Sequence, residues 1–232
     1  MKKLASVLAL ALSLSLVLTA CGGGEEPAPS NPSTSTPSTS EPAATPDAPA
    51  EGEYTWRTSA DNKVVTENGT FTKDNVSGDV LITSIGQSAD VSMLDALMKK
   101  VGAEYTFNAT ASADEVANYG TLILACGASS KGLGAAGISQ EDELARAQAI
   151  VDTCKDKGIV VIAAHLGGSA RRGALSDQFN DMALTCANYI IVVEEGNDDG
   201  KFTDAAVDKG IPVTLVNSIA DTLTPLTDLF GA

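Results

Sequence analysis

The residues best suited to chemistry lie in four glycine-rich segments, at 83–90, 126–137, 165–173 and 194–200. Each segment follows a short apolar run, and the second and third contain basic residues. Glycine lets backbone N–H groups turn toward a ligand, and the planar guanidinium of arginine fits a carboxylate or phosphate. The segments therefore predict a site for a small anionic ligand, formed by Gln87, Ser88, Ser129, Ser130, Lys131, Gly132, His165, Gly167, Ser169, Arg171 and Arg172.

A purely structural role for the two arginines stays open beside this prediction. Acidic residues follow them closely, among them Asp177 and Asp181. Arg171 and Arg172 could form surface ion pairs with these carboxylates instead of binding a ligand. The charge pattern favours neither interpretation over the other.

Cys126, His165 and Glu194 suggest a second kind of site. Each comes at the end of one of three consecutive apolar runs, and His165 is the only histidine of the chain. A cysteine nucleophile, a histidine base and an orienting carboxylate are the parts of covalent catalysis. However, a cysteine that closes an apolar run is usually a core residue, and no G-x-S-x-G nucleophile elbow is present. A Cys/His-dependent hydrolase or transferase is therefore an alternative to ligand binding.

Gly132, Gly134 and Gly137 spell G-x-G-x-x-G, the pattern of dinucleotide-binding loops. In that pattern the glycines directly follow a strand, whereas residues 127–131 intervene here. The acid that binds the ribose is also missing, because the next apolar run ends in His165. We therefore expect no nucleotide cofactor.

Three cysteines, Cys126, Cys154 and Cys186, lie beyond the N-terminal region that contains Cys21. Three thiols cannot all pair, and their spacing fits no zinc pattern. Cys154 falls on the apolar face of a predicted helix and Cys186 near the end of another, so we interpret both as small core residues. The sequence predicts neither a disulfide framework nor a metal site.

The elements that position these segments alternate regularly from residue 79 onward. Six runs are apolar on both faces, as in parallel strands covered by helices on each side, at 80–82, 105–107, 121–125, 159–164, 189–193 and 212–216. Helical periodicity separates them, at 91–101, 139–157, 176–187, 202–209 and 219–230. The pattern predicts a doubly wound α/β domain over 79–232, Rossmann-like or flavodoxin-like, with five or six parallel strands in three layers. The chemical segments then gather at the carboxyl ends of the strands, where such sheets bind ligands.

Residues 54–78 do not follow this alternation of strands and helices. Lys63–Thr66 and Thr70–Thr72 are β-prone and flank Glu67-Asn68-Gly69. Because Asn-Gly between such residues is a strong turn signal, we expect a β-hairpin there, with Trp56 packing it onto the main domain.

The N-terminal region predicts export and lipid anchoring. Lys2 and Lys3 precede an apolar run at 4–19, which suits a signal peptide at residues 1–20. Leu18-Thr19-Ala20-Cys21 resembles the lipobox of bacterial lipoprotein precursors, which implies cleavage before Cys21 and a lipid on its sulfur. Residues 22–53 hold seven of the nine prolines and no large apolar residue, so we expect 21–53 to be an anchored, disordered stalk.

The acidic charge narrows the expected partners. A formal net charge of −15 repels phosphate backbones, so we expect no nucleic-acid partner. The expected partners are a membrane, held through the lipid on Cys21, and a small anionic ligand. A protein-interaction domain in a cell-envelope complex is a further alternative.

Residues 129–137 and 165–173 are similar to segments of an uncharacterised family of exported bacterial domains of unknown function. The resemblance covers residues 79–230. It implies an α/β domain and marks both segments as family motifs, but it implies no activity.

Overall fold

The predicted apolar runs form one sheet in the computed structural model, which describes residues 63–231. The strand order is β1-β7-β6-β5-β4-β2-β3, and β2 to β7 are parallel. This confirms the predicted α/β fold with six parallel strands. The strands are β1 Val64–Glu67, β2 Val80–Ile85, β3 Thr106–Phe107, β4 Thr121–Cys126, β5 Val160–His165, β6 Tyr189–Val193 and β7 Val213–Val216.

Local signals begin and end the helices. The Ser139 hydroxyl accepts the Asp142 N–H before α4, and Gly158 ends that helix at a φ of 66°, in the left-handed region that glycine tolerates. The helices are α1 Asp90–Val101, α2 Ala113–Val116, α3 Ser130–Ala136, α4 Gln140–Lys157, α5 Ala174–Cys186, α6 Lys201–Lys209 and α7 Leu223–Phe230. Residues 63–231 also contain four 3₁₀ turns, η1 Lys73–Asn75 between β1 and β2, η2 Gly168–Arg171 after β5, η3 Glu194–Gly196 after β6 and η4 Ile219–Thr222 after β7.

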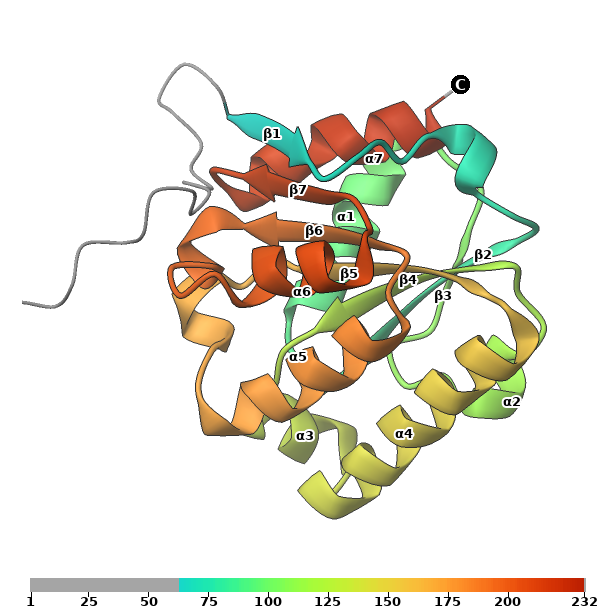
Figure 1. Cartoon of the computed structure of the whole chain (residues 1–232). Helices are drawn as coiled ribbons and strands as arrows, with labels where there is room; N and C mark the ends of the chain where they lie inside the picture. Colours follow the sequence, from blue (N-terminus) through green and yellow to red (C-terminus); the bar gives the residue numbers. More distant parts are fainter. Residues whose placement is uncertain (1–62, 232) are drawn as a thin grey trace, which may run out of the picture. The chain divides into compact units, whose positions relative to one another are not determined.

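The sheet separates two apolar cores. One face packs against α2, α4, α5 and α6 around Leu122, Leu124 and Phe179, and the other packs against α1 and α7 around Ile123 and Ile162. Figure 1 shows α4, α5 and α6 in front of the strands and α1 and α7 behind them. The molecule therefore has the three layers expected of strands that are apolar on both faces.

The strand order reverses between β2 and β4. The chain passes from β2 outward to β3, then returns to the other side of β2 and continues through β4, β5, β6 and β7. This is the flavodoxin-like order, extended by one parallel strand and by β1. Because the strands are parallel, the segments after β2, β4, β5 and β6 all leave the sheet at the same edge.

The predicted hairpin at 54–78 is wrong in its pairing. Within residues 63–78, only β1 is a strand, and it runs antiparallel to β7 at the edge of the sheet (Figure 1). The Asn68 side chain donates to Ala206 O and Ile211 O, so the Asn-Gly turn caps the end of α6 instead of folding the chain back on itself. Phe71 then stacks on Tyr189, with ring centroids 4.7 Å apart. Pairing of β1 with the edge strand β7 and stacking of Phe71 on Tyr189 therefore replace the predicted pairing within a local hairpin.

Several predictions lie outside the described residues. These are the signal peptide at 1–20, lipidation of Cys21, the stalk at 21–53 and the packing of Trp56. Between residues 63 and 231, no helix combines the length and the apolar composition needed to cross a bilayer.

Candidate functional site

Backbone fills the crevice between β2 and β4, where this fold usually binds its ligand. The Ser129 N–H donates to Gly86 O at 3.0 Å, and Gln87 forms an isolated bridge with Ala128. A side chain at residue 86 would place its Cβ 2.5 Å from Gly127 O, so only glycine fits this approach. The two loops are therefore closed onto each other.

The second predicted segment is a helix for most of its length, not a long loop. Ser129 accepts the Gly132 N–H and begins α3, and Gly137 ends it at a φ of 68°. Gly132 and Gly134 are therefore helical and do not form a phosphate-binding turn. This geometry supports the prediction that the G-x-G-x-x-G pattern is not a dinucleotide site. The absence of a Cβ at Gly132 instead lets α3 approach the backbone of Gln87.

A buried ion pair on α4 holds the loop after β2. Arg146 donates to both Glu143 carboxylate oxygens, at 2.7 and 2.8 Å, and the Glu143 side chain is fully buried. Glu143 Oε1 also accepts the Gly86 N–H at 2.8 Å and the Gln87 amide at 3.1 Å. Arg146 donates further to Ala111 O at 2.6 Å and to Ser84 O. We call Glu143 and Arg146 the α4 clamp. The α4 clamp positions Gln87, whose side-chain amide donates to Glu143 and to Ala109 O. Both amide hydrogens of Gln87 are therefore used within the protein.

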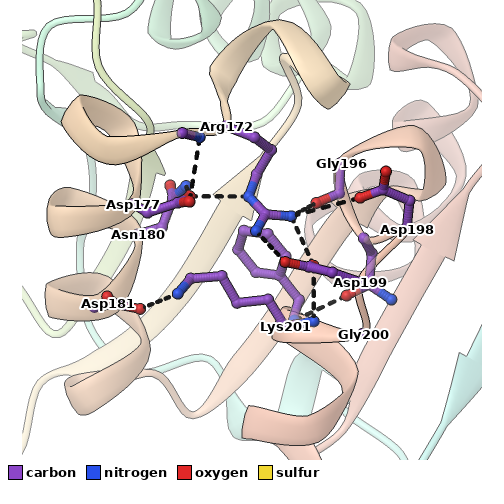
Figure 2. A network of polar contacts seen from close by, with 12 residues as sticks. Arg172, Asp177, Asn180, Asp181, Gly196, Asp198, Asp199, Gly200 and Lys201 are labelled. Atoms are coloured by element: carbon purple, nitrogen blue, oxygen red, sulfur yellow. Dashed lines mark hydrogen bonds and ion pairs between the residues drawn. The ribbon is translucent and has the colours of Figure 1, made fainter.

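Arg172 is a structural residue. Its guanidinium lies between Asp177 on one side and Asp198 and Asp199 on the other, as Figure 2 shows. It donates to Asp177 at 2.9 Å, to Asp199 at 2.6 and 2.9 Å, and to Gly196 O. The hydrogen bond from Arg172 holds the pKa of Asp199 at about 2. The ion-pair interpretation therefore describes Arg172, which ties the loop after β5 to the loop after β6.

Arg171 is left largely without partners. Its Nε lies 3.9 Å from Asp90 Oδ1, which is too long for a hydrogen bond, and has no hydrogen-bond partner among residues 63–231. One terminal nitrogen donates to Ala170 O at 3.1 Å. The side chain lies against Gly127 and Gly167, where a Cβ would collide with it, and is 27% exposed. Arg171 is thus held in place by packing, with hydrogen-bonding capacity to spare.

Asp90 faces Arg171 from the first turn of α1. Asp90 is 2% exposed, and within the described chain its Oδ2 has no hydrogen-bond partner. Burial raises the pKa of Asp90, against the lowering effects of Ser88 and Arg171. A carboxylate that is buried, beside a cation but not hydrogen-bonded to it, is energetically costly to maintain.

His165 and Asn180 form the floor beneath Asp90 and Arg171. His165 Nε2 lies 3.2 Å from Gly168 O, and its ring packs on Phe202 with centroids 4.6 Å apart. His165 Nδ1 and Asn180 Oδ1 are both buried, and neither has a partner that meets hydrogen-bond geometry in the described part of the chain, although Asn180 lies close enough to raise the pKa of His165. Burial lowers the pKa of His165 and favours the neutral imidazole. We call Asp90, His165, Arg171 and Asn180 the polar seam.

The Cys126 thiol is poorly placed for catalysis. Cys126 and His165 lie at the ends of the adjacent strands β4 and β5, as the sequence predicted, but both are fully buried. Burial raises the pKa of the Cys126 thiol, which keeps it protonated and unreactive. Glu194 is half-buried at the start of η3, and Gly196 of the same loop lies against the imidazole. These features weigh against the hydrolase or transferase alternative.

The other predicted residues divide by exposure. Ser130, Lys131 and Ser169 are exposed at the rim, whereas Gln87 and Ser88 are buried and bonded within the protein. Ser129 caps α3, and Gly132 and Gly167 serve close packing. Among residues 63–231, no cluster of three or more His, Cys, Asp or Glu side chains could hold a metal ion.

Sequence reasoning missed Asp90, Asn180 and the α4 clamp. A detectable signal existed for Glu143, because it shares the apolar stripe of α4 with Ala147, Ile150 and Cys154. A charged residue on a buried helix face requires a partner. Asn180 gives no such signal, because its place beside His165 depends on how α5 packs against β5.

A shallow groove lies at the opposite edge of the sheet. Residues 78–80, 104–106, 118 and 119 line it, at the amino ends of β2 and β3. None of the predicted site residues lies in it.

Comparisons with known proteins identify a family but no activity. No curated protein matches the sequence. Among solved structures, a GDP-L-fucose synthetase from Naegleria fowleri aligns at 12% identity and a TM-score of 0.26, over 66% of this chain and 51% of that chain. The chain thus spans about half the length of that protein, and so low a TM-score carries no argument. The family model described as "Domain of unknown function (DUF6305)" matches residues 77–230, so the chain belongs to this uncharacterised family.

Proposed function

We propose that this chain is a membrane-tethered extracytoplasmic lipoprotein whose α/β domain binds a small anionic ligand above the carboxyl ends of β2, β4 and β5. The observation that carries the proposal is Arg171. The cations predicted for the site are Lys131, Arg171 and Arg172. Arg171 is partly buried, and its Nε lacks a hydrogen-bond partner within residues 63–231. A buried guanidinium nitrogen without an acceptor is costly, and an anionic ligand would supply that acceptor.

Asp90, which lies beside Arg171 in the polar seam, indicates which chemical groups the ligand carries. Asp90 Oδ2 has no partner that meets hydrogen-bond geometry in the described chain, although the nearby Gly167 backbone and Ser88 side chain lower the pKa of this carboxyl. An anion without a hydrogen-bond donor, such as sulfate, would bind Arg171 but would be repelled by the Asp90 carboxylate. A ligand that carries a hydroxyl or ammonium group next to its anionic group would satisfy both residues. We therefore favour small hydroxy acids, amino acids or protonated phosphates over sulfate.

The test is a thermal-shift screen on the chain from residue 21 onward, carrying Cys21→Ser. A ligand present at about 100 times its Kd is expected to raise Tm by roughly 5–10 °C, because binding to the folded state alone stabilises it. Arg171→Gln keeps the aliphatic stem that packs on Gly127 and Gly167 but removes the charge, and it should abolish most of the rise.

Lys157→Gln is the matched control, because Lys157 is an exposed cation at the far end of α4. It should leave the rise in Tm unchanged. A rise that persists in Arg171→Gln, or the failure of every carboxylate, phosphate and sulfonate ligand to raise Tm, would disprove ligand binding at Arg171.

The tether is tested separately. Cys21→Ser is expected to abolish the incorporation of labelled palmitate in cells and to move the protein from the detergent phase to the aqueous phase in a phase-separation assay. The physical reason is that two acyl chains bury many methylenes, each contributing about 0.8 kcal/mol. Cys186→Ala is the control and should retain the label. Labelled Cys21→Ser protein would contradict the proposed anchor.

A further inference from the structure

Two of the three cysteines within residues 63–231, Cys154 and Cys186, lie near each other at the ends of packed helices. Cys154 comes near the end of α4, and Cys186 is the last residue of α5. The two helices pack against each other on the same face of the sheet (Figure 1), and both cysteines belong to the apolar core on that face. The sequence indicated a core position for each residue, but not their proximity, because residues 155–185 separate them along the chain.

The ends of the two helices meet, because just beyond them the Asn188 N–H donates to Val161 O and the Val161 N–H donates to Asn188 Oδ1. The Cys154 thiol donates a hydrogen bond to the Cys186 sulfur, and Cys186 Sγ also lies 3.4 Å from Ala183 O. Both cysteines are free thiols in the structure. Two thiols that interact across packed helices can form a disulfide when their Cα atoms lie within about 7 Å of each other.

The two thiols are not equivalent. Cys186 is 9% exposed and Cys154 is 2% exposed, so a reagent reaches Cys186 first. The Lys209 ammonium group donates to Thr185 O, next to Cys186, and Lys155 lies one residue after Cys154. The hydrogen bond from Cys154 and these two cations lower the pKa of Cys186, against the opposing effect of burial. The same hydrogen bond, together with burial, raises the pKa of Cys154. Because Cys186 is the more exposed of the two, we assign it as the attacking thiol and Cys154 as the resolving thiol.

We propose that Cys154 and Cys186 form a dithiol–disulfide site that exchanges with small-molecule disulfides and, when oxidised, joins α4 to α5. The Cys186 thiolate attacks one sulfur of the disulfide, forming a mixed disulfide and releasing one thiolate. Cys154 then loses its proton and attacks Cys186 Sγ, which forms the Cys154–Cys186 bond and releases the second thiolate. The two cysteines lose two electrons in total, and the small disulfide is reduced to two thiols. This inference is independent of the proposed ligand site.

Cys126 provides an internal reference for this site. It is fully buried at the end of β4, and burial raises the pKa of its thiol. Oxidation should therefore spare it. Cys126→Ala leaves the Cys154–Cys186 pair intact and is the matched control variant.

The experiment uses the reduced, folded chain from residue 21 onward with Cys21→Ser. It is incubated with oxidised glutathione, the remaining thiols are alkylated after unfolding, and peptides are mapped by mass spectrometry. We expect a Cys154–Cys186 cross-link, a loss of two reactive thiols, an alkylated Cys126 and a rise in Tm of roughly 5–10 °C. Cys126→Ala should behave like the parent.

Single variants separate the two roles. Cys154→Ala should trap glutathione on Cys186, because the resolving thiol is gone, whereas Cys186→Ala should leave Cys154 reduced. The proposal is overturned if Cys154 and Cys186 both remain alkylatable after oxidation, or if the cross-link contains Cys126. Failure of the anion screen at Arg171 would not affect any of these results.

Discussion

Replacing Arg146 with methionine is expected to lower the free energy of unfolding by about 3–5 kcal/mol, which makes it one of the most damaging single changes in the domain. Arg146 is the partner of the fully buried Glu143 carboxylate, and methionine preserves much of its volume. The variant leaves the Glu143 charge buried and uncompensated, and it removes the donors to Ala111 O and Ser84 O. A buried charge without its counterion costs far more than a lost surface contact.

Urea unfolding followed by circular dichroism would measure this loss, with Lys99→Met as the matched control. Lys99 forms an ion pair with Asp95 one helical turn away, but its side chain is 68% exposed. Exposed pairs of this kind contribute less than about 1 kcal/mol. The control should therefore unfold at nearly the parent urea concentration.

A second variant distinguishes the buried charge from simple loss of packing. Glu143→Gln/Arg146→Met removes both charges and keeps an amide oxygen that can accept the Gly86 N–H. It should recover about half of the loss, because the remaining cost is that of unpaired neutral groups. If the single variant loses less than about 1 kcal/mol, the α4 clamp does not hold the loop after β2.

The strands and most helices could be predicted because their signals are local. Ser139 and Gly158 begin and end α4 by hydrogen bonds and backbone angles that involve only neighbouring residues. Runs apolar on both faces mark β4 and β5 in the same way. The hairpin predicted at 54–78 was wrong because the contacts that decide the path of the chain there are long-range. Asn68 does form a turn, but its hydrogen bonds go to residues more than 130 positions away.

The predicted site residues lie at the carboxyl-end edge of the sheet, but the sequence does not distinguish the surroundings of Arg171 from those of Arg172. Arg171 and Arg172 are adjacent in the sequence, yet one packs on Gly127 and Gly167 and the other lies among Asp177, Asp198 and Asp199. The two side chains point in different directions because η2 ends at Arg171 and the backbone of Arg172 is extended, with a φ of −114°. Sequence spacing cannot distinguish two neighbouring side chains that point toward different loops.

The glycines of α3 should respond in opposite directions to the same substitution. Gly→Ala within a helix normally stabilises by about 0.5–1 kcal/mol, because alanine loses less backbone freedom on folding. Gly134 follows this rule, since a Cβ there would meet nothing within 4 Å, and Gly134→Ala should raise stability by that amount. At Gly132 a Cβ would lie far inside van der Waals contact of the Gln87 carbonyl oxygen. Gly132→Ala should therefore destabilise by about 2–4 kcal/mol.

The reason for this contrast is the position of Gln87. Its backbone cannot retreat from α3, because its side chain is bonded to Glu143 and its neighbour Gly86 donates to the same carboxylate. The clash at residue 132 must therefore be relieved by moving α3 or by breaking the α4 clamp, and either movement exposes buried groups. Urea unfolding of both alanine variants measures the difference directly. Two stabilising alanines would show that α3 does not pack against the loop after β2, and would reopen a ligand-binding role for Gly132.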